Sequence, residues 1–244
     1  GGEIADAAQV RELVRELLDF YGVLRGQLGL SLPIVDFGGS LACATTTHHS
    51  TRALRLNRSL GIELRPRPLE RVLSIADYVR ELVQGVAERC QREGWARPRI
   101  FVEPGRALTS NTQLLLCTVT SLKQSGAAGV VHAILDAGVN IAEPVRGEYH
   151  QIFVAGRQAA DERSYRLVGP ICTPMDTLAW SWRLPELQPG SVLGIMDAGA
   201  YFVPFATSFS FPQPAIVLVD GGEVRLVRRA EGFEDLVRRD DEVG

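Results

Sequence analysis

Residues 100–106 place side chains that can bind a charged ring directly after an apolar run. The apolar residues 100–102 lead into Glu103, Pro104, Gly105 and Arg106. A carboxylate here can accept a hydrogen bond from a protonated ring nitrogen, a glycine lets a ligand approach the backbone, and an arginine can hold an anion. A Pro-Gly turn flanked by a surface ion pair is the alternative, and these residues alone leave both interpretations open.

A second candidate is the glycine turn DFGGS at 36–40. Gly38 and Gly39 offer backbone N–H groups that no side chain obstructs, as a phosphate bound at the end of a strand requires. The spacing matches neither the dinucleotide fingerprint nor a P-loop. Taken alone, plain turn chemistry is the commoner explanation for two adjacent glycines.

The second half of the chain carries a cysteine and a tyrosine in loops between apolar runs. Cys172 and Asp176 lie in VGPICTPMDTL, and Tyr201 lies in MDAGAYF. A lone cysteine is more often a small buried apolar residue, and a tyrosine is more often a core aromatic. His48 and His49 have no cysteine or carboxylate at metal-ligand spacing, which favours a solvated loop.

The elements that position the first two candidates follow an alternating pattern. Spacings of three and four between apolar residues predict helices over 7–28 and 74–93, and Gly29 is a plausible helix stop. Each helix precedes a short apolar run that ends in one of the polar turns, while residues 41–71 lack periodicity and predict a long loop. This alternation is typical of βα units over a parallel sheet.

After about residue 112 the pattern changes to short β-rich runs separated by glycine, proline or aspartate. These runs predict an antiparallel sheet or small barrel. The chain is therefore expected to contain an α/β part at 1–112 and an all-β part at 113–244. The runs are LLLCTVTSLKQ, GVVHAILDAG, EYHQIFVAG, SYRLVGPIC, SVLGIMDAG, AIVLVDGG and EVRLVRRA.

Composition excludes several classes of function. The 244 residues are 45% hydrophobic and carry a formal net charge of -3, so neither nucleic acid nor an anionic membrane is expected as a partner. No apolar run is long enough to span a bilayer and no signal peptide is evident, which predicts a cytoplasmic protein. Four scattered cysteines fit neither a disulfide framework nor a zinc site, and no metal is expected.

The order of the motifs is more specific than any one of them. VDFGGS, FVEPGRAL, ILDAGVN, VGPICTPMDTL, LPELQPGSVLGIMDAGAY and PAIVLVDGGEVRLVRR occur in this sequence. In sequence and spacing they resemble the pyridoxal-phosphate-dependent decarboxylases that act on diaminopimelate, ornithine and arginine. The resemblance implies the C-terminal part of a (β/α)8 barrel that binds pyridoxal 5'-phosphate, followed by a β-barrel or sandwich domain. It also implies a homodimer whose active sites are shared between subunits.

Site residues follow from the same resemblance. Glu103 corresponds to the carboxylate on the pyridine nitrogen, and Cys172 corresponds to the cysteine that returns a proton after carbon dioxide leaves. Thr173 and Asp176 lie beside that cysteine as expected substrate contacts, and Arg106 is expected to contact both cofactor and substrate. The remaining cofactor positions correspond to Gly38, Gly39, Gly105 and Tyr201.

Three departures from the family pattern shape the expected function. The only lysine is Lys123, in a β-rich run, so the lysine that forms the Schiff base is expected on a missing N-terminal barrel segment. A complete barrel needs roughly 250 residues, far more than precede the β-rich part. Thr173 and Pro174 replace the Glu-Ser that follows the cysteine in diaminopimelate decarboxylases, and Glu143 replaces the arginine that binds the distal end of the substrate.

These departures favour an amino-acid substrate other than diaminopimelate. The alternative is a non-catalytic homologue that binds a partner protein or a metabolite, which the absent lysine supports. A racemase of the same barrel class fits less well, because the cysteine loop is typical of the decarboxylases.

Overall fold

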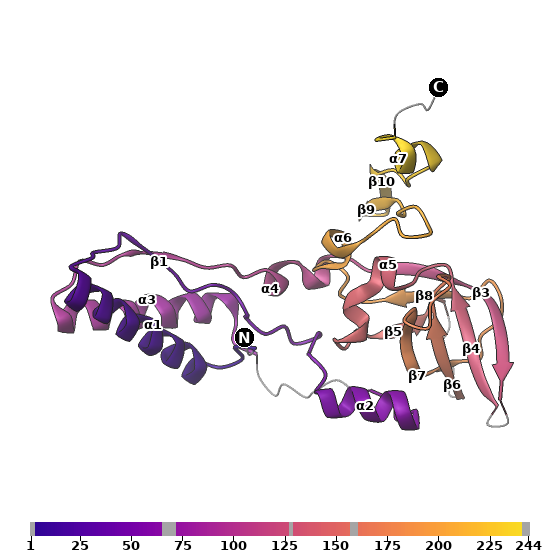
Figure 1. Cartoon of the computed structure of the whole chain (residues 1–244), viewed down its shortest axis with the longest axis horizontal. Coiled ribbons are helices and arrows are strands. Elements are labelled where there is room, and N and C mark those ends of the chain that lie inside the picture. The colour runs from indigo at the N-terminus through magenta and orange to yellow at the C-terminus, as the bar shows by residue number, and fades with distance from the viewer. Residues whose placement is uncertain (1–2, 65–71, 127–128, 157–160, 241–244) are drawn as a thin grey trace. The chain divides into compact units, whose positions relative to one another are not determined.

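The computed structural model describes residues 3–64, 72–126, 129–156 and 161–240, and its elements are labelled in Figure 1. The chain divides into two compact units. The first consists of Gly1–His48 and Pro66–Gln113, and the second of His49–Arg65 and Leu114–Gly244. The expectation of an α/β part followed by a β-rich part is confirmed. The assignment of 1–112 to a barrel half stays a prediction.

Two long helices and a pair of parallel strands form the first unit. Helices α1 (Ala7–Leu28) and α3 (Ile75–Glu93) confirm the predicted helices, and each ends at a left-handed glycine, Gly29 or Gly94. Strands β1 (Ile34–Asp36) and β2 (Arg99–Phe101) pair in parallel, and α4 (Arg106–Thr109) and η1 (Ser110–Thr112) follow β2. Apolar side chains from both long helices and β1 form one core: Val10, Val14, Leu18, Tyr21, Val35, Phe37, Leu41, Tyr78, Leu82, Val86 and Cys90.

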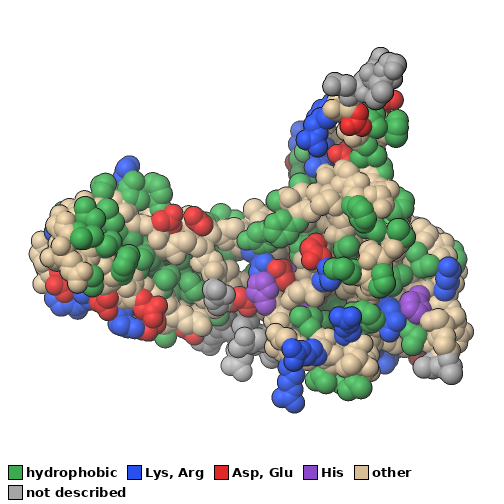
Figure 2. Space-filling view, in the orientation of Figure 1, with side chains coloured by type: hydrophobic (Ala, Val, Ile, Leu, Met, Phe, Trp, Pro, Cys, Tyr) green, Lys and Arg blue, Asp and Glu red, His purple; other side chains and the backbone are tan. Residues whose placement is uncertain are grey.

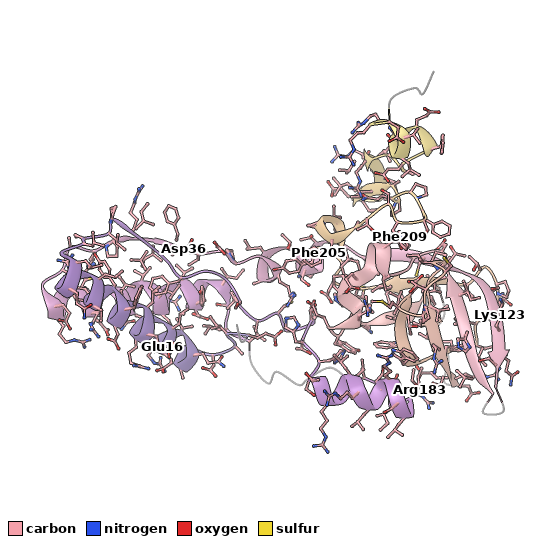
Figure 3. All side chains as sticks on the ribbon, viewed as in Figure 1. Glu16, Asp36, Lys123, Arg183, Phe205 and Phe209 are labelled. Atoms are coloured by element: carbon pink, nitrogen blue, oxygen red, sulfur yellow. The ribbon has the colours of Figure 1, made fainter. Side chains whose placement is uncertain are left out.

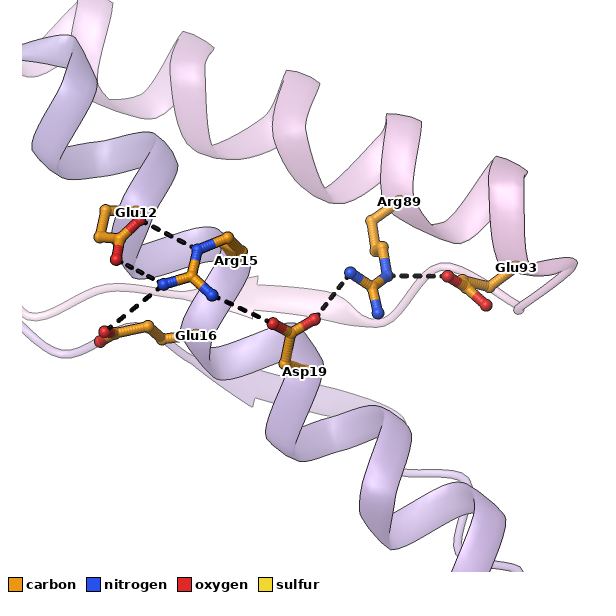
Figure 4. A network of polar contacts seen from close by, with 6 residues as sticks. All are labelled: Glu12, Arg15, Glu16, Asp19, Arg89 and Glu93. Carbon is orange, nitrogen blue, oxygen red and sulfur yellow. Dashed lines mark hydrogen bonds and ion pairs between the residues drawn. The ribbon is translucent and has the colours of Figure 1, made fainter.

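Ion pairs on the surface of the first unit connect its two long helices. Arg15 of α1 contacts Glu12, Glu16 and Asp19, and Asp19 also accepts from Arg89 of α3 at 2.7 Å (Figure 4). Exposed pairs of this kind contribute little to stability. The apolar core therefore accounts for most of the packing between α1 and α3.

A six-stranded, nearly closed sheet dominates the second unit. The strands are β3 (Leu115–Ser125), β4 (Val130–Leu135), β5 (Ile152–Val154), β6 (Glu162–Val168), β7 (Thr177–Pro185) and β8 (Val192–Ile195), in the order β5-β8-β3-β4-β6-β7. All neighbours are antiparallel except β4 and β6. Trp182 of edge strand β7 donates from Nε1 to the Ile152 carbonyl of edge strand β5 at 3.3 Å, which brings the two edges together.

One prediction is wrong in the second unit. Residues 41–71 are not wholly a loop, because α2 (Thr51–Leu60) forms within them, capped by Ser50 and ended by Gly61. Ala53, Leu56 and Leu60 recur at spacings of three and four on this short helix, although only Asn57 is buried. Residues 65–71 lie outside the described part. The Arg58 guanidinium of α2 lies over the Trp180 ring of β7, 5.5 Å from the ring centroid.

Short helices and one β-hairpin make up the remaining elements of the second unit. Helices α5 (Val139–Ala142) and η2 (Glu143–Arg146) follow β4, and α6 (Phe202–Phe205) follows β8. Strands β9 (Ile216–Asp220) and β10 (Glu223–Arg228) form a hairpin, and α7 (Phe233–Val237) comes after it. Within the described residues, no helix is both long and apolar enough to cross a membrane.

Candidate functional site

Two polar turns lie side by side at the carboxyl end of the β1–β2 pair. Phe37 N donates to the Phe101 carbonyl at 3.0 Å, and Glu103 N donates to the Gly38 carbonyl at 2.7 Å. Backbone pairing thus continues past both strands into the turns. The glycine turn and the Glu103 turn, predicted separately, are brought together by these two bonds.

Glycine is required where the two turns meet. A Cβ at Gly39 would lie 2.1 Å from the backbone oxygen of Glu103, so no other residue fits without moving one turn. Gly38 has φ +66, a conformation that favours glycine. Asp36, labelled in Figure 3, accepts from Gly38 N at 2.8 Å and fixes the turn. The two glycines therefore allow the backbone of Glu103 to lie close against the glycine turn.

Arg106 begins the short helix α4 and is largely buried. Its side chain is 14% exposed, and Nη1 lies 3.2 Å from His48 Nε2 and 4.0 Å from Glu3 Oε1. Glu3 reaches this place because its neighbour Ile4 pairs with the backbone beside the glycine turn: Ile4 N donates to the Ser40 carbonyl at 2.8 Å. A carboxylate and an imidazole thus restrict the guanidinium.

Sequence reasoning missed both neighbours of Arg106. The prediction that His48 lies in a solvated loop is confirmed, since its side chain is 54% exposed and it belongs to no helix or strand, but its contact with Arg106 and that of Glu3 are not predicted. No signal in the sequence connects residue 3 with residue 106, because the contact depends on backbone pairing of an extended segment. A separate pocket of about 310 Å³ in the first unit is lined by residues of 41–45 and 72–75 together with Ala107 and Asn111, and none of the predicted site residues lines it.

The second unit presents Cys172 on the tight loop between β6 and β7. The cysteine side chain is exposed, and the loop is closed by Gly169 N donating to the Asp176 carbonyl at 3.0 Å. Thr173 Oγ1 accepts from Met175 N at 3.3 Å, and the Thr173 carbonyl accepts from Asp176 N at 3.0 Å. Backbone bonds within the loop thus hold the thiol at the surface.

Asp176 holds this loop from within. Its side chain is buried, and its two carboxylate oxygens accept from Val139 N at 2.8 Å and from Ile171 N at 2.7 Å. A Cβ at Gly138 or at Gly169 would lie 2.3 Å from a carboxylate oxygen of Asp176. The aspartate therefore joins the turn after β4 to the Cys172 loop, and both glycines make room for it.

Tyr201 lies in the turn after β8 with a positive φ of 68°, a conformation that is uncommon for a residue with a side chain. Its ring is exposed and lies 5.4 Å from that of Phe205 (labelled in Figure 3). In η2, Glu143 accepts from Arg146 at 3.1 Å. Lys123 is an exposed residue of β3 within the sheet.

The predicted site residues thus form two groups. Gly38, Gly39, Glu103, Gly105 and Arg106 share one end of the β1–β2 pair in the first unit. The other group is in the second unit and consists of Cys172, Thr173, Asp176 and Tyr201.

Comparison with known proteins identifies the family to which this chain belongs. The model of the pyridoxal-dependent decarboxylase C-terminal sheet domain matches residues 19–199. A diaminopimelate decarboxylase of Methanothermobacter thermautotrophicus is 32% identical, with 98% of this chain and 51% of the relative covered. The chain belongs to the pyridoxal-dependent decarboxylase family.

Other relatives agree with this family. A diaminopimelate decarboxylase of Aquifex aeolicus is 29% identical over 97% of this chain and 50% of the relative. The crystal structure of diaminopimelate decarboxylase from Helicobacter pylori in complex with L-lysine shares the fold, with a TM-score of 0.70 and 23% identity over 98% of this chain and 52% of that one. The chain spans about half the length of the curated relatives it matches.

The first group of residues fits the cofactor that the family name implies. The close approach of Gly39 to the Glu103 backbone leaves no room for a Cβ. The group combines backbone N–H groups of glycine turns, a carboxylate and a guanidinium. These binding groups suit a ligand with a basic ring nitrogen and a phosphate.

Proposed function

We propose that this chain is the C-terminal part of a pyridoxal-phosphate-dependent amino-acid decarboxylase. The single observation that carries the proposal is the hydrogen-bonded contact between the glycine turn and Glu103 at the end of the β1–β2 pair. In this proposal the chain acts with polypeptide corresponding to the part of its relatives that it does not match. Together they would form the barrel, with residues 1–112 of this chain as its second half and residues 113–244 as the β-domain.

The first unit would hold the cofactor. Gly39 and Gly105 would present backbone N–H groups to its phosphate, and Gly38, whose own N–H donates to Asp36, would shape the turn that holds it. Glu103 would accept a hydrogen bond from the ring nitrogen and keep that nitrogen protonated. When bound, the pyridoxal ring withdraws electrons from the carbon that loses carbon dioxide. Arg106 would hold an anionic group of cofactor or substrate, with His48 and Glu3 limiting its position.

The second unit would complete the site from a second subunit of a homodimer. Cys172 would donate a proton from its thiol to the carbon that has lost the carboxylate. Thr173, next to it, would contact the substrate, and Tyr201 would contact the cofactor. Asp176 was expected as a substrate contact, but its bonds to two backbone amides support a different role: it positions the Cys172 loop.

The substrate would be an amino acid without a carboxylate at its distal end. Glu143 stands where the resemblance implies an arginine, and a carboxylate there repels an anionic group and favours a cation. Arg146 pairs with Glu143 at 3.1 Å, so a bound cation would compete with that arginine. Turnover of lysine or ornithine but not diaminopimelate would support this, and preferred turnover of diaminopimelate would contradict it.

A non-catalytic homologue is the second candidate, favoured by a specific observation. The one lysine of the chain, Lys123, is an exposed residue of strand β3, in a different unit from Glu103 (Figure 3 labels it). Such a homologue would bind a partner protein or a metabolite through the same surface. It would not hold pyridoxal phosphate covalently.

Borohydride reduction of the native protein tests the proposal. The protein is purified from its source with pyridoxal phosphate present and reduced, so that the cofactor is fixed to the lysine that binds it. Peptide mapping is expected to find the label on a lysine outside residues 1–244. Label on Lys123 would contradict the proposed site, and no label on any peptide would favour the non-catalytic homologue.

Variants of the same protein test the role of Glu103. Glu103→Gln removes the charge that keeps the ring nitrogen protonated, so the decarboxylation rate is expected to fall by about 10²-fold or more. Glu16→Gln, an exposed change in the same unit, is the matched control and should leave the rate unchanged. A near-normal rate for Glu103→Gln with cofactor bound would refute the assignment.

A further inference from the structure

His150 is a buried histidine that belongs to neither group of predicted site residues. It precedes β5, and its side chain is 1% exposed. Nδ1 of the ring lies 2.9 Å from the Met196 carbonyl, and because a carbonyl oxygen only accepts, Nδ1 carries the proton and donates. The imidazole therefore connects the segment before β5 to the residue that directly follows β8.

The rest of the imidazole ring is enclosed as well. Nε2 lies 3.6 Å from Glu148 Oε2, and the Phe202 ring packs edge-on against the imidazole with 5.1 Å between the two centroids. All of these residues belong to the second unit. The burial of His150 is therefore complete within this chain and does not depend on further polypeptide.

The two contacts of His150 lie at the two ends of the turn that carries Tyr201. Met196 begins this turn, and Phe202 directly follows Tyr201. Within the turn, Asp197 has φ 60° and Tyr201 has φ 68°, although neither residue is glycine. Left-handed backbone is unfavourable for a residue with a side chain and persists only where surrounding contacts enforce it. The turn therefore needs to be held at its ends, and the imidazole contacts both.

The same turn presents the tyrosine ring outward while its backbone is held from within. Tyr201 is 41% exposed, and Figure 2 shows apolar side chains on the surface of the segment that contains α6. Ala198 and Ala200 of the turn are buried. A shift of the turn backbone would therefore move the tyrosine ring with it.

We infer that His150 is a positioning residue that holds the turn of residues 196–202 so that Tyr201 meets the cofactor. The inference rests on the proposed function, in which Tyr201 contacts pyridoxal phosphate. His150 is buried against the turn, so it acts through Tyr201 and does not touch the ligand. Without its N–H, the Met196 carbonyl loses a donor and the left-handed backbone of the turn can relax.

Two amide variants separate the hydrogen bond from the polarity of the side chain. In His150→Asn the amide nitrogen takes the place of Nδ1 and can donate to the Met196 carbonyl. In His150→Gln the amide takes the place of Nε2 and extends toward Glu148. His132→Gln is the matched control, because the His132 ring contacts Ser125 and Arg166 instead of this turn.

Amide exchange and cofactor affinity are measured on the native protein expressed from its own locus. In His150→Gln, exchange of the amides of residues 196–202 is expected to accelerate about tenfold. The dissociation constant of pyridoxal phosphate, added back to cofactor-free protein, should also rise about tenfold. Both quantities should stay close to the wild-type values in His150→Asn and in His132→Gln.

A double variant tests whether His150 acts through Tyr201. Tyr201→Ala removes the ring whose position matters, so adding His150→Gln to it should not weaken cofactor binding further, although exchange of the turn should still accelerate. A histidine with a merely structural role would weaken binding equally with or without the ring. Additive effects on the dissociation constant would therefore overturn the inference.

Failure of this inference is distinguishable from failure of the proposed function. Wild-type exchange of residues 196–202 in His150→Gln, or equal acceleration in His150→Asn and His150→Gln, would overturn the positioning role. Faster exchange in His150→Gln alone, in a protein that binds no pyridoxal phosphate, would support the hold of His150 on the turn and overturn the proposed function instead.

Discussion

The substitution Asp176→Asn is expected to loosen the Cys172 loop. The Asp176 carboxylate accepts from two buried backbone amides, Val139 N at 2.8 Å and Ile171 N at 2.7 Å. Asparagine keeps one acceptor oxygen and places an NH₂ group against the other amide. One hydrogen bond to a charged acceptor is then lost and one buried N–H is left without a partner.

The size of this effect follows from the burial of the site. The aspartate is 2% exposed, so water cannot replace the lost acceptor. Leaving one buried amide unsatisfied and removing one charge-assisted bond costs about 2–4 kcal/mol together. That corresponds to roughly a 30-fold to 700-fold change in the equilibrium constant for opening the loop.

Amide exchange and denaturant unfolding measure the change. In Asp176→Asn, exchange of the Val139 and Ile171 amides is expected to accelerate by about 10²-fold, and the midpoint of urea unfolding should fall. Asp136→Asn is the matched control, because Asp136 accepts from Thr118 N at 2.7 Å through Oδ1, an oxygen that asparagine keeps, and lies at an exposed position. The control should change the free energy of unfolding by less than about 1 kcal/mol.

One result would refute the reasoning. If Asp176→Asn unfolds at the wild-type urea concentration and both amides exchange at the wild-type rate, the carboxylate does not hold the loop. Equal effects of Asp176→Asn and Asp136→Asn would also contradict it, since burial would then make no difference.

Three further predictions concern other parts of the chain. Gly39→Ala should lower the melting temperature more than Gly38→Ala, because the added Cβ meets the Glu103 backbone at position 39, whereas position 38 has open space and only its φ of +66 to oppose alanine. Burial raises the pKa of the Cys117 thiol from 9.0 to about 12, so this thiol ionises at lower pH in the unfolded chain than in the folded one. The free energy of unfolding should therefore fall as pH rises from about 9 to 12. Urea titrations at several pH values should show this slope, and Cys117→Val should flatten it. Trp182→Phe removes the indole N–H that connects the two edges of the sheet and should cost about 1 kcal/mol in the same titrations.

The sequence predicts the long helices well because their signals are local. Ala7–Leu28 is preceded by Asp6, which forms a capping box with Gln9, and it ends at Gly29. Helix α2 is missed because it is only ten residues long, so that Ala53, Leu56 and Leu60 give a short apolar period within an arginine-rich segment. Strand β7 is missed as a separate run, although it pairs with β6 and forms an edge of the nearly closed sheet.

Pairings between distant segments are what the sequence does not reveal. The parallel alignment of β4 with β6 places Ala133 opposite Leu167, and no periodicity specifies that choice. The contact of Arg106 with His48 depends in the same way on how a loop returns to the end of β2. Local patterns predict which residues are polar at the end of a strand, but not which other side chains meet them.

Contacts of glycines with distant residues explain why the sequence motifs indicate the family only when they occur together and in order. Gly138, Gly169 and Asp176 are unremarkable singly, yet a Cβ at either glycine would collide with the carboxylate. The three residues therefore constrain one another through space, even though the turn after β4 and the Cys172 loop are about 30 positions apart in sequence. Gly39 and Glu103 constrain one another in the same way in the first unit. A chain that keeps both sets at these spacings retains the two close backbone approaches on which the proposed site depends, whichever amino acid it acts on.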